Sequence, residues 1–523
     1  MRHAHGRAFA WMALVLWTLG ACSAHGESAG FENIRHVYER GAPCVLRFRA
    51  PGADTVSFDV SGWLPASAAV EGGVADYAVD TAKLAAGDYV VHATPRNAQG
   101  AEAAVRFPVT IAPPHDDERL SVWRWGGGGS DPAWWVRRGF TGAFYGSTRN
   151  PVSADSGTAG NLHQAFERAA RHDFELGLYF YPLLSKQLAA QEDLLCLYPD
   201  GARQTDRPKP YPREPEVMAH ARATVDSTLA LFHDYPGLRH VMLHSEWKTP
   251  YCVNETAVEL ARAEAGLDPR DFVRGHGGLA APEDGAVADG LIADDNPRYR
   301  FLQWWWQRGH GTAPLNAELH EIVKEHNPDL LTWHEPYRLA PVRGSHTGLD
   351  CIATWTYGHP DIKRLCYTTY LQAAARPEGQ LVQQDITLYL YGRFVIPLDD
   401  SKANLAEDFP GRDPFFTAGP DYAREAMWIV LSQRPDILCF YSAGRLSPDK
   451  PANDPFYASP DTFNAIGQTC EALVKPYGPA LLACRRTPAR VAVLMSAAAT
   501  WFRESPRLRG YSNEQTLPYA TLL

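Results

Sequence analysis

The sequence lacks several features that would narrow its class. Beyond its N-terminus it has no run of the roughly 20 apolar residues that a transmembrane helix needs. It has no excess of positive charge, since 50 Lys and Arg against 60 Asp and Glu give a net charge of −10, and nucleic acid is therefore not expected as a partner. Its nine cysteines include no CxxC pair, and its histidines form no HExxH motif. We accordingly expect no metal and no cofactor.

The N-terminus has the features of an export signal. Arg2 and Arg7 form a basic start, and an apolar stretch over residues 8–19 follows, too short to span a bilayer as a folded anchor. It ends in Leu19-Gly-Ala-Cys22, which resembles a bacterial lipobox and predicts lipidation of Cys22 after cleavage of the signal peptide. The alternative is an ordinary signal peptide cut after Ala21 or Ala24. Both readings predict export to the bacterial cell envelope. The protein would be lipid-anchored to the membrane in the first case and periplasmic or secreted in the second.

Cysteine usage is consistent with an exported chain without requiring disulfides. An oxidising compartment permits them, but a chain of 523 residues can bury a large core without them. We expect most of the eight cysteines after Cys22 to be small buried apolar residues.

Residues 31–112 predict a small β domain. Short segments alternate apolar and polar residues, with turn residues between them. This spacing favours an immunoglobulin-like β-sandwich. A polar linker over residues 112–118 follows. The expected strands are residues 45–49, 55–60, 89–93 and 104–111.

Residues 118–450 alternate short apolar strands with helical patterns, which is typical of βα units around a parallel sheet. Eight is the number of strands that closes a (β/α)8 TIM barrel. An open doubly wound sheet is the alternative, but no Gly-x-Gly-x-x-Gly fingerprint follows the first strand. The expected strands are residues 120–125, 140–145, 174–181, 240–244, 330–333, 351–355, 381–385 and 437–441. The expected helices include residues 162–171, 217–232, 300–309, 315–326 and 423–432.

Two long loops and a C-terminal segment complete the organisation. Residues 182–216 and 266–297 are long enough to be functional lids or mobile inserts. Residues 460–523 predict one helix and one apolar strand, residues 490–496, which cannot bury their own apolar faces. We read this segment as the start of a C-terminal α/β domain that is truncated; packing on the barrel is the alternative.

Three carboxylates stand at strand ends. Glu246 closes the fourth expected strand, Glu335 the fifth and Asp385 the seventh. Barrel active sites lie at the carboxyl ends of the strands, so these side chains are expected to share one cleft. Cleavage of a glycosidic bond needs two carboxyl groups, one to protonate the leaving oxygen and one to attack the sugar or activate water.

Aromatic and histidine residues near these carboxylates suit sugar recognition, because an aromatic face packs on the apolar face of a pyranose. Strand alternation places His244 and Glu246 on one face but His334 and Glu335 on opposite faces. The Trp304-Trp-Trp306 run is expected to be core. The candidate binding residues are His244, Trp247, Trp333, His334, Tyr337, Trp355, Tyr357 and Tyr391, with Tyr251 and Tyr389 nearby.

The order of these strands and strand-end residues along the chain resembles that of clan A glycoside hydrolases, and it is most like that of the family 42 β-galactosidase type. The resemblance implies that Leu243-His-Ser-Glu246 holds the acid/base, Glu246. It covers about residues 118 to 523 and departs from the family twice. Ser245 stands where the family has Asn, and strand seven offers Gln383-Gln-Asp385 where a Glu is expected.

The predicted function is an exported glycoside hydrolase that cleaves poly- or oligosaccharides. The alternative is a non-catalytic, glycan-binding surface lipoprotein on a degenerate barrel. The second carboxylate stays open between Asp385 and Glu335. Each candidate also has a structural alternative: a rim salt bridge for Glu246, Arg338 as partner of Glu335, and Arg393 as partner of Asp385.

Overall fold

The computed structural model describes two compact units, Met1–Ile111 and Ala112–Leu523, and each is considered by itself. The described residues are 28–33, 35–116, 118–125, 131–247, 249–280, 292–335, 348–355, 380–391, 415–441, 443 and 459–484. Cys22 and the expected strand over residues 490–496 lie outside them.

The N-terminal unit contains two antiparallel sheets. Alternation of apolar and polar residues creates one buried face per strand; in Cys44–Arg49, for example, Cys44, Leu46 and Phe48 are buried and the residues between them are exposed. One sheet has the order β1 (Gly30–Phe31), β3 (Cys44–Arg49), β6 (Val74–Val79). The other has the order β2 (Val37–Glu39), β9 (Val105–Ala112), β7 (Gly87–Asn97), β4 (Thr55–Val60), β5 (Trp63–Ala69), with β8 (Gly100–Ala101) paired to β7. A short 3-10 helix, η1 (Thr81–Lys83), precedes β7.

The second unit confirms the α/β class. All eight expected strands form, and they pair in parallel in an order that closes on itself. The last strand pairs with the first from Ser121↔Ile437 to Trp125↔Tyr441. The strands are β10 (Ser121–Trp125), β11 (Gly142–Thr148), β12 (Glu175–Phe180), β13 (Leu238–Ser245), β16 (Leu331–Glu335), β17 (Cys351–Trp355), β18 (Leu381–Thr387) and β21 (Ile437–Tyr441). A separate two-stranded antiparallel sheet pairs β19 (Tyr389–Tyr391) with β20 (Phe415–Thr417).

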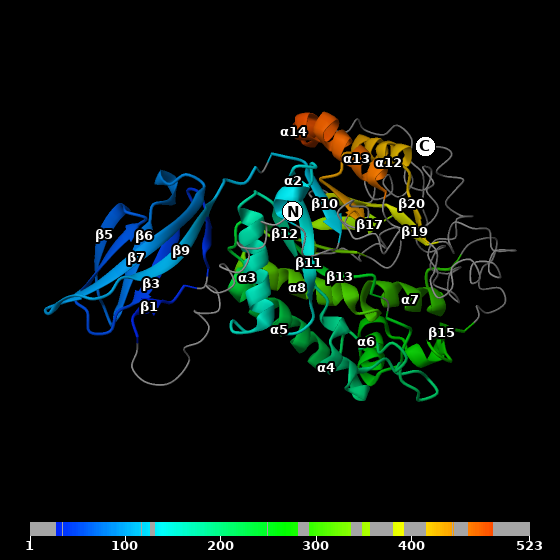
Figure 1. Cartoon of the computed structure of the whole chain (residues 1–523). Helices are drawn as coiled ribbons and strands as arrows, with labels where there is room; N and C mark the ends of the chain where they lie inside the picture. Colours follow the sequence, from blue (N-terminus) through cyan, green and yellow to red (C-terminus); the bar gives the residue numbers. More distant parts are fainter. Residues whose placement is uncertain are drawn as a thin grey trace, which may run out of the picture. The chain divides into compact units, whose positions relative to one another are not determined.

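Helices pack outside this strand ring, with α3, α5 and α8 on one side and α12, α13 and α14 grouped on another (Figure 1). Several begin with proline in the first turn, where its missing N–H costs nothing. The main core lies between strands and helices, whereas a second cluster with Trp123 and Trp333 fills the interior of the ring. The helices are α2 (Pro132–Val136), α3 (Gly157–Ala170), α5 (Pro215–Phe232), α8 (Thr312–His326), α12 (Pro420–Ser432), α13 (Pro460–Thr469), η7 (Cys470–Val474) and α14 (Lys475–Ala483).

The long segments after β12 and β13, for which the sequence predicts functional lids or mobile inserts, carry short helices and a hydrophobic core of their own. Trp305 is fully buried in this core with Cys196 and Cys252, and the expectation that the Trp304–Trp306 run is core is confirmed. The elements are η2 (Pro182–Leu184), α4 (Lys186–Ala189), η3 (Glu192–Leu194), α6 (Glu255–Ala265), η4 (Pro269–Asp271), β14 (Val273–Arg274), β15 (Gly278–Leu279), α7 (Pro297–Trp304) and η5 (Trp305–Gly309).

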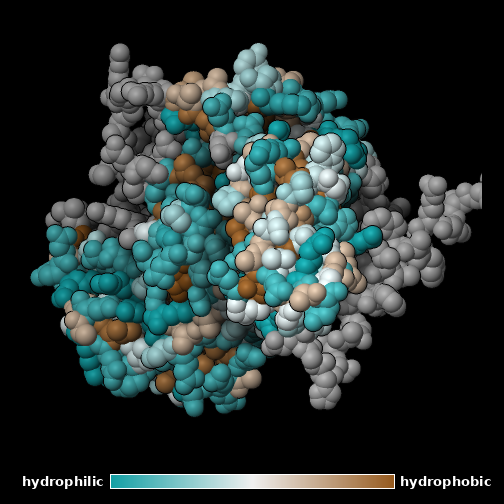
Figure 2. Space-filling model, turned by 90° about the vertical axis from the view of Figure 1, so that its left-hand side faces the viewer, coloured by the Kyte–Doolittle hydropathy of each residue, from teal (hydrophilic) through white to brown (hydrophobic). Residues whose placement is uncertain are grey.

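The face drawn in Figure 2 is mostly hydrophilic, with hydrophobic residues in small groups. Scattered apolar side chains are normal on water-exposed protein surfaces. Among the helices that the structure describes, none combines the length and apolarity needed to cross a membrane.

Candidate functional site

The three carboxylates predicted from the sequence lie at the carboxyl ends of strands in the ring. Glu246 directly follows β13, Glu335 ends β16, and Asp385 lies in β18. The backbone N–H of Glu246 donates to the carbonyl of Glu335 at 2.9 Å, and the side chains of Glu335 and Asp385 are hydrogen-bonded to each other. The fold therefore gathers all three residues at the end of the ring where parallel barrels carry active sites.

A bulge at the end of β13 sets the position of Glu246. Met242 pairs with Trp333 and Ser245 with Glu335, so β13 has one extra residue between these pairs. Within and just after the bulge, His244 has a φ of 66° and Glu246 a φ of 51°. Such left-handed backbone at a residue other than glycine costs on the order of 1–3 kcal/mol, and it tends to occur at functional sites.

Ser245 contacts the carboxylate cluster directly. Its hydroxyl donates to Oε2 of Glu335 at 2.7 Å. The prediction that His244 shares a face with Glu246 assumed regular alternation, which the bulge interrupts. His244 is fully buried, and its Nδ1 hydrogen-bonds Oδ1 of Asn316 on α8 at 2.9 Å. Burial lowers the pKa of His244 to about 4, so this ring is neutral at pH 7.

Glu335 and Asp385 form a buried carboxyl pair, with exposed fractions of 2% and 0%. Burial raises the pKa of Glu335 well above its ordinary value, and the charge and hydrogen bond of Asp385 raise it further. The burial and the Asp385 contact therefore favour the protonated form of Glu335. The amide of Gln383 donates to Asp385 at 3.1 Å, and the thiol of Cys439 also hydrogen-bonds Asp385.

An aromatic wall stands beside the carboxylates. We use this name for Trp125, Tyr179, Tyr181 and Tyr441, which come from the carboxyl ends of β10, β12 and β21. The Trp125 ring lies 5.2 Å from that of Tyr179 and 6.4 Å from that of Tyr441. Burial raises the pKa of Tyr179 and Tyr181, and the nearby charges of Glu246 and Glu335 raise both further. Carboxylates and aromatics thus share one environment.

Trp247 is buried instead of presenting an open face. Its exposed fraction is 3%, its indole N–H donates to Thr249 at 3.1 Å, and the ammonium of Lys209 lies 4.1 Å from its ring centroid. Burial lowers the pKa of Lys209. This cation–π contact joins the segment after β12 to the one after β13, beside Glu246.

Two further predicted binding residues are also interior. Trp333 is fully buried inside the ring, 4.5 Å from the Phe144 ring, so a direct sugar contact no longer fits it. His334 has an exposed fraction of 4%. Tyr251 is buried beside Trp305 in the separate core of the segments after β12 and β13. Tyr337 and Tyr357, like Arg338 and Arg393, lie outside the described residues, and the same holds for the side chains of Trp355, Tyr389 and Tyr391.

Sequence reasoning missed Ser245 as a partner of the cluster, and Tyr179, Tyr181 and Tyr441 as part of its wall. The three tyrosines lay inside expected strands, two of them at the carboxyl-terminal residue. That position was the available signal for Tyr181 and Tyr441. No sequence signal predicted the contact of Ser245 with Glu335, because the bulge in β13 turns Ser245 toward it.

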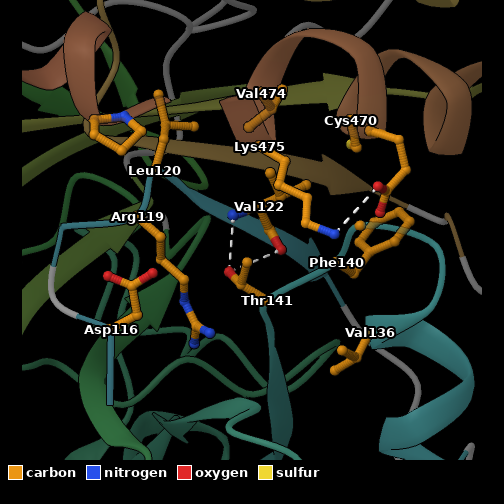
Figure 3. Close-up of a pocket in the computed structure, with 13 residues that line it drawn as sticks. Asp116, Arg119, Leu120, Val122, Val136, Phe140, Thr141, Cys470, Val474 and Lys475 are labelled. Atoms are coloured by element: carbon orange, nitrogen blue, oxygen red, sulfur yellow. Dashed lines mark hydrogen bonds and ion pairs between the residues drawn. The ribbon is translucent and has the colours of Figure 1, made fainter. Parts of the chain in front are cut away.

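A cavity of about 240 Å³ lies at the opposite ends of the strands. Figure 3 shows it between Asp116 and Arg119 on one side and Lys475 from α14 on another, with Val122 and Thr141 at its floor. These residues belong to the amino-terminal ends of β10 and β11 and to their surroundings, so this cavity is separate from the carboxylates. Among the described side chains, no group of His, Cys, Asp and Glu has the arrangement of a metal site.

Comparison with known proteins finds similarity in structure. No protein-family model matches the sequence, and no curated protein matches it significantly. The cold-adapted β-galactosidase from Rahnella sp. R3 is similar with a TM-score of 0.50 and 13% identity, over 75% of this chain and 60% of that enzyme. A family 39 glycoside hydrolase from Bacteroides cellulosilyticus WH2 matches with a TM-score of 0.37 and 11% identity, over 85% of this chain and 83% of that one. The chain therefore shares the fold of the Rahnella enzyme over three quarters of its length.

Proposed function

We propose that this protein is a glycoside hydrolase, with Glu246 as general acid/base. The observation that carries the proposal is the convergence of three carboxyl groups beside an aromatic wall at the carboxyl ends of the strands. We further infer that the strand ring is a (β/α)8 barrel of the clan A type and that the N-terminal unit is an immunoglobulin-like sandwich. The shared fold with a β-galactosidase supports the first of these assignments.

The contacts of the three carboxylates indicate that they have different roles. The two catalytic carboxyl groups of a glycosidase stand about 5 Å apart or more, because the reacting bond lies between them. Glu335 and Asp385 are hydrogen-bonded to each other, too close to hold a sugar bond between them. They act as one unit, and Glu246 stands as the other partner.

The mechanism follows from this division. Glu246 is partly exposed and reaches the leaving oxygen, which it protonates. The Glu335–Asp385 pair faces the anomeric carbon and stabilises the positive charge that develops there. As the bond to the leaving oxygen breaks, a carboxylate of the pair either bonds to that carbon, with water displacing it in a second step, or takes a proton from the water that attacks the carbon directly. Ser245 stabilises the pair through its hydrogen bond to Glu335. At the position of Ser245, the family 42 enzymes that the sequence resembles have an Asn that binds the sugar.

Substitution of Glu246 by Gln tests this role on a panel of glycans and of aryl glycosides whose phenol is weakly acidic. Loss of a general acid/base lowers the turnover number by about 10²–10⁴. Glu321→Gln, on an exposed position of α8, is the matched control and keeps wild-type activity. Wild-type turnover by Glu246→Gln would remove Glu246 from the acid/base role.

A second candidate function is glycan binding without turnover. The burial of both Glu335 and Asp385 favours it, because a buried pair has limited access to a substrate. This alternative predicts saturable binding to a glycan, with no product released from any substrate that binds. Calorimetry combined with product analysis separates the two functions.

We also propose that the chain is exported and lipid-anchored through Cys22, on the strength of the sequence features at residues 1–22. Expression of the full chain in a bacterial host, followed by fractionation, tests this. The wild type is expected in the membrane fraction and Cys22→Ser outside it. Equal membrane recovery of both would contradict lipidation.

A further inference from the structure

Two cysteines from different loop segments meet in the separate hydrophobic core of the segments after β12 and β13. Cys196 follows η3 after β12, and Cys252 lies in the segment between β13 and α6. The backbone N–H of Val253 donates to the carbonyl of Leu197 at 2.8 Å. This bond fixes the residues next to each cysteine against one another.

The side chain of Asn254 strengthens the same junction. Its Oδ1 accepts the backbone N–H of Leu197 at 2.8 Å, and its Nδ2 donates to the carbonyl of Leu195 at 3.1 Å. Three hydrogen bonds therefore hold residues 195–197 beside residues 252–254. The two segments keep this register without any covalent link.

The two thiols are in direct contact. Cys196 and Cys252 both have an exposed fraction of 0% and belong to one core cluster, and their side chains are hydrogen-bonded to each other. Both are free cysteines in the structure. Burial and the Cys196 contact raise the pKa of the Cys252 thiol well above its ordinary value, so the folded pair reacts slowly as thiolate. Oxidation is therefore fastest before this core closes around the pair.

We propose that Cys196 and Cys252 form a disulfide when the chain folds in the presence of a disulfide-containing oxidant. One S–S bond forms, both thiol hydrogens leave as protons, and two electrons reduce the oxidant's disulfide to two thiols. The backbone junction holds the two cysteines beside each other. The assignment is independent of any glycosidase activity.

The bond would join the segment after β12 to the segment after β13. The chain between the two cysteines includes α5, β13 and Glu246, so a cross-link closes a loop around the strand that carries the candidate acid/base. A cross-link stabilises mainly by restricting the unfolded chain, and more so for a long loop. The bond would reinforce the Lys209–Trp247 contact, which joins the same two segments.

The test is to refold the full chain with oxidised and reduced glutathione, quench with acid, alkylate free thiols, and map disulfides by mass spectrometry without reduction. We expect a linked peptide pair containing residues 196 and 252, which disappears on treatment with a reductant. Exposed Cys484 takes up glutathione and confirms that the oxidant is active.

Two variants make the assignment specific. Cys196→Ser abolishes the linked pair, whereas Cys470→Ser, at another buried cysteine, leaves it intact. Alkylation of both Cys196 and Cys252 while Cys484 is oxidised would overturn the proposal, and so would linkage of either cysteine to a different partner. The wild-type map alone decides the question if Cys196→Ser does not fold.

Discussion

Substitution of Glu335 by Gln tests whether Glu335 is a neutral acid in the folded protein. Glutamine keeps the shape of a protonated carboxyl group. Its NH2 group can donate to Asp385, and its carbonyl can accept from Ser245, so both hydrogen bonds of Glu335 survive. We therefore expect Glu335→Gln to fold with little loss of stability at low pH, whereas loss of a buried polar partner would cost about 1–3 kcal/mol.

The pH dependence of stability gives the sharper signature. Unfolding returns the pKa of Glu335 from its raised value to its ordinary 4.5. Between these two pKa values the folded chain binds one more proton than the unfolded chain, so the stabilisation is fully present below 4.5 and is lost as the pH rises. The slope is about 1.4 kcal/mol per pH unit for one proton. The free energy of unfolding of Glu335→Gln lacks this pH dependence. Relative to wild type, it therefore rises by about 1.4 kcal/mol for each pH unit in this range.

Urea denaturation of both proteins at a series of pH values from 5 upward measures the difference. All other titrating groups are common to both chains and largely cancel. Glu321→Gln, exposed on α8, is expected to follow the wild-type curve. Parallel curves for Glu335→Gln and wild type, or a wild type that gains stability relative to Glu335→Gln as the pH rises, would refute a neutral Glu335.

Three further predictions concern the aromatic wall, the opposite end of the barrel and the bulge. Trp125→Ala weakens sugar binding by about tenfold in calorimetry, through the loss of about 1.4 kcal/mol of stacking, while Trp428→Ala, at an exposed position on α12, has no effect. Glu175→Ala removes a buried carboxylate that pairs with Arg and Trp side chains, which lowers the free energy of unfolding by about 3–5 kcal/mol in urea without changing sugar affinity. Burial lowers the pKa of His244 to about 4, so we expect its ring to stay neutral at pH 6 in an NMR titration. Its contribution to the free energy of unfolding is lost as the pH falls from 6.5 toward 4. A ring that protonates near pH 6.5 would contradict its burial.

Periodicity in the sequence was sufficient to predict the eight strands of the ring and helices α3, α5, α8 and α12, but it did not predict α6. Each strand of the ring is a short apolar run, and its position between helices determines its place in the order. The carboxylates at strand ends could be found for the same reason. Glu246, Glu335 and Asp385 each stand where an apolar run meets polar residues, and such positions share one end of a barrel.

Other features of the site depend on tertiary contacts that no local pattern encodes. The bulge in β13 changes which residues face the carboxylates, and it turns Ser245 toward Glu335. The predicted sugar platforms at Trp247 and Trp333 are buried, one beneath Lys209 and the other inside the ring. An aromatic residue near a strand end fits core and cleft equally well, so sequence alone does not separate these roles.

The central claim is that Glu246 donates the proton to the departing sugar oxygen. The most direct measurement compares wild type and Glu246→Gln on two aryl glycosides of the same sugar, one with an acidic phenol and one with a weakly acidic phenol as leaving group. An acidic phenol leaves without proton assistance. We predict that Glu246→Gln retains its bond-cleavage rate for the first substrate and loses about 10²–10⁴ for the second. An equal loss on both substrates, or none on either, would contradict the role of Glu246 as proton donor.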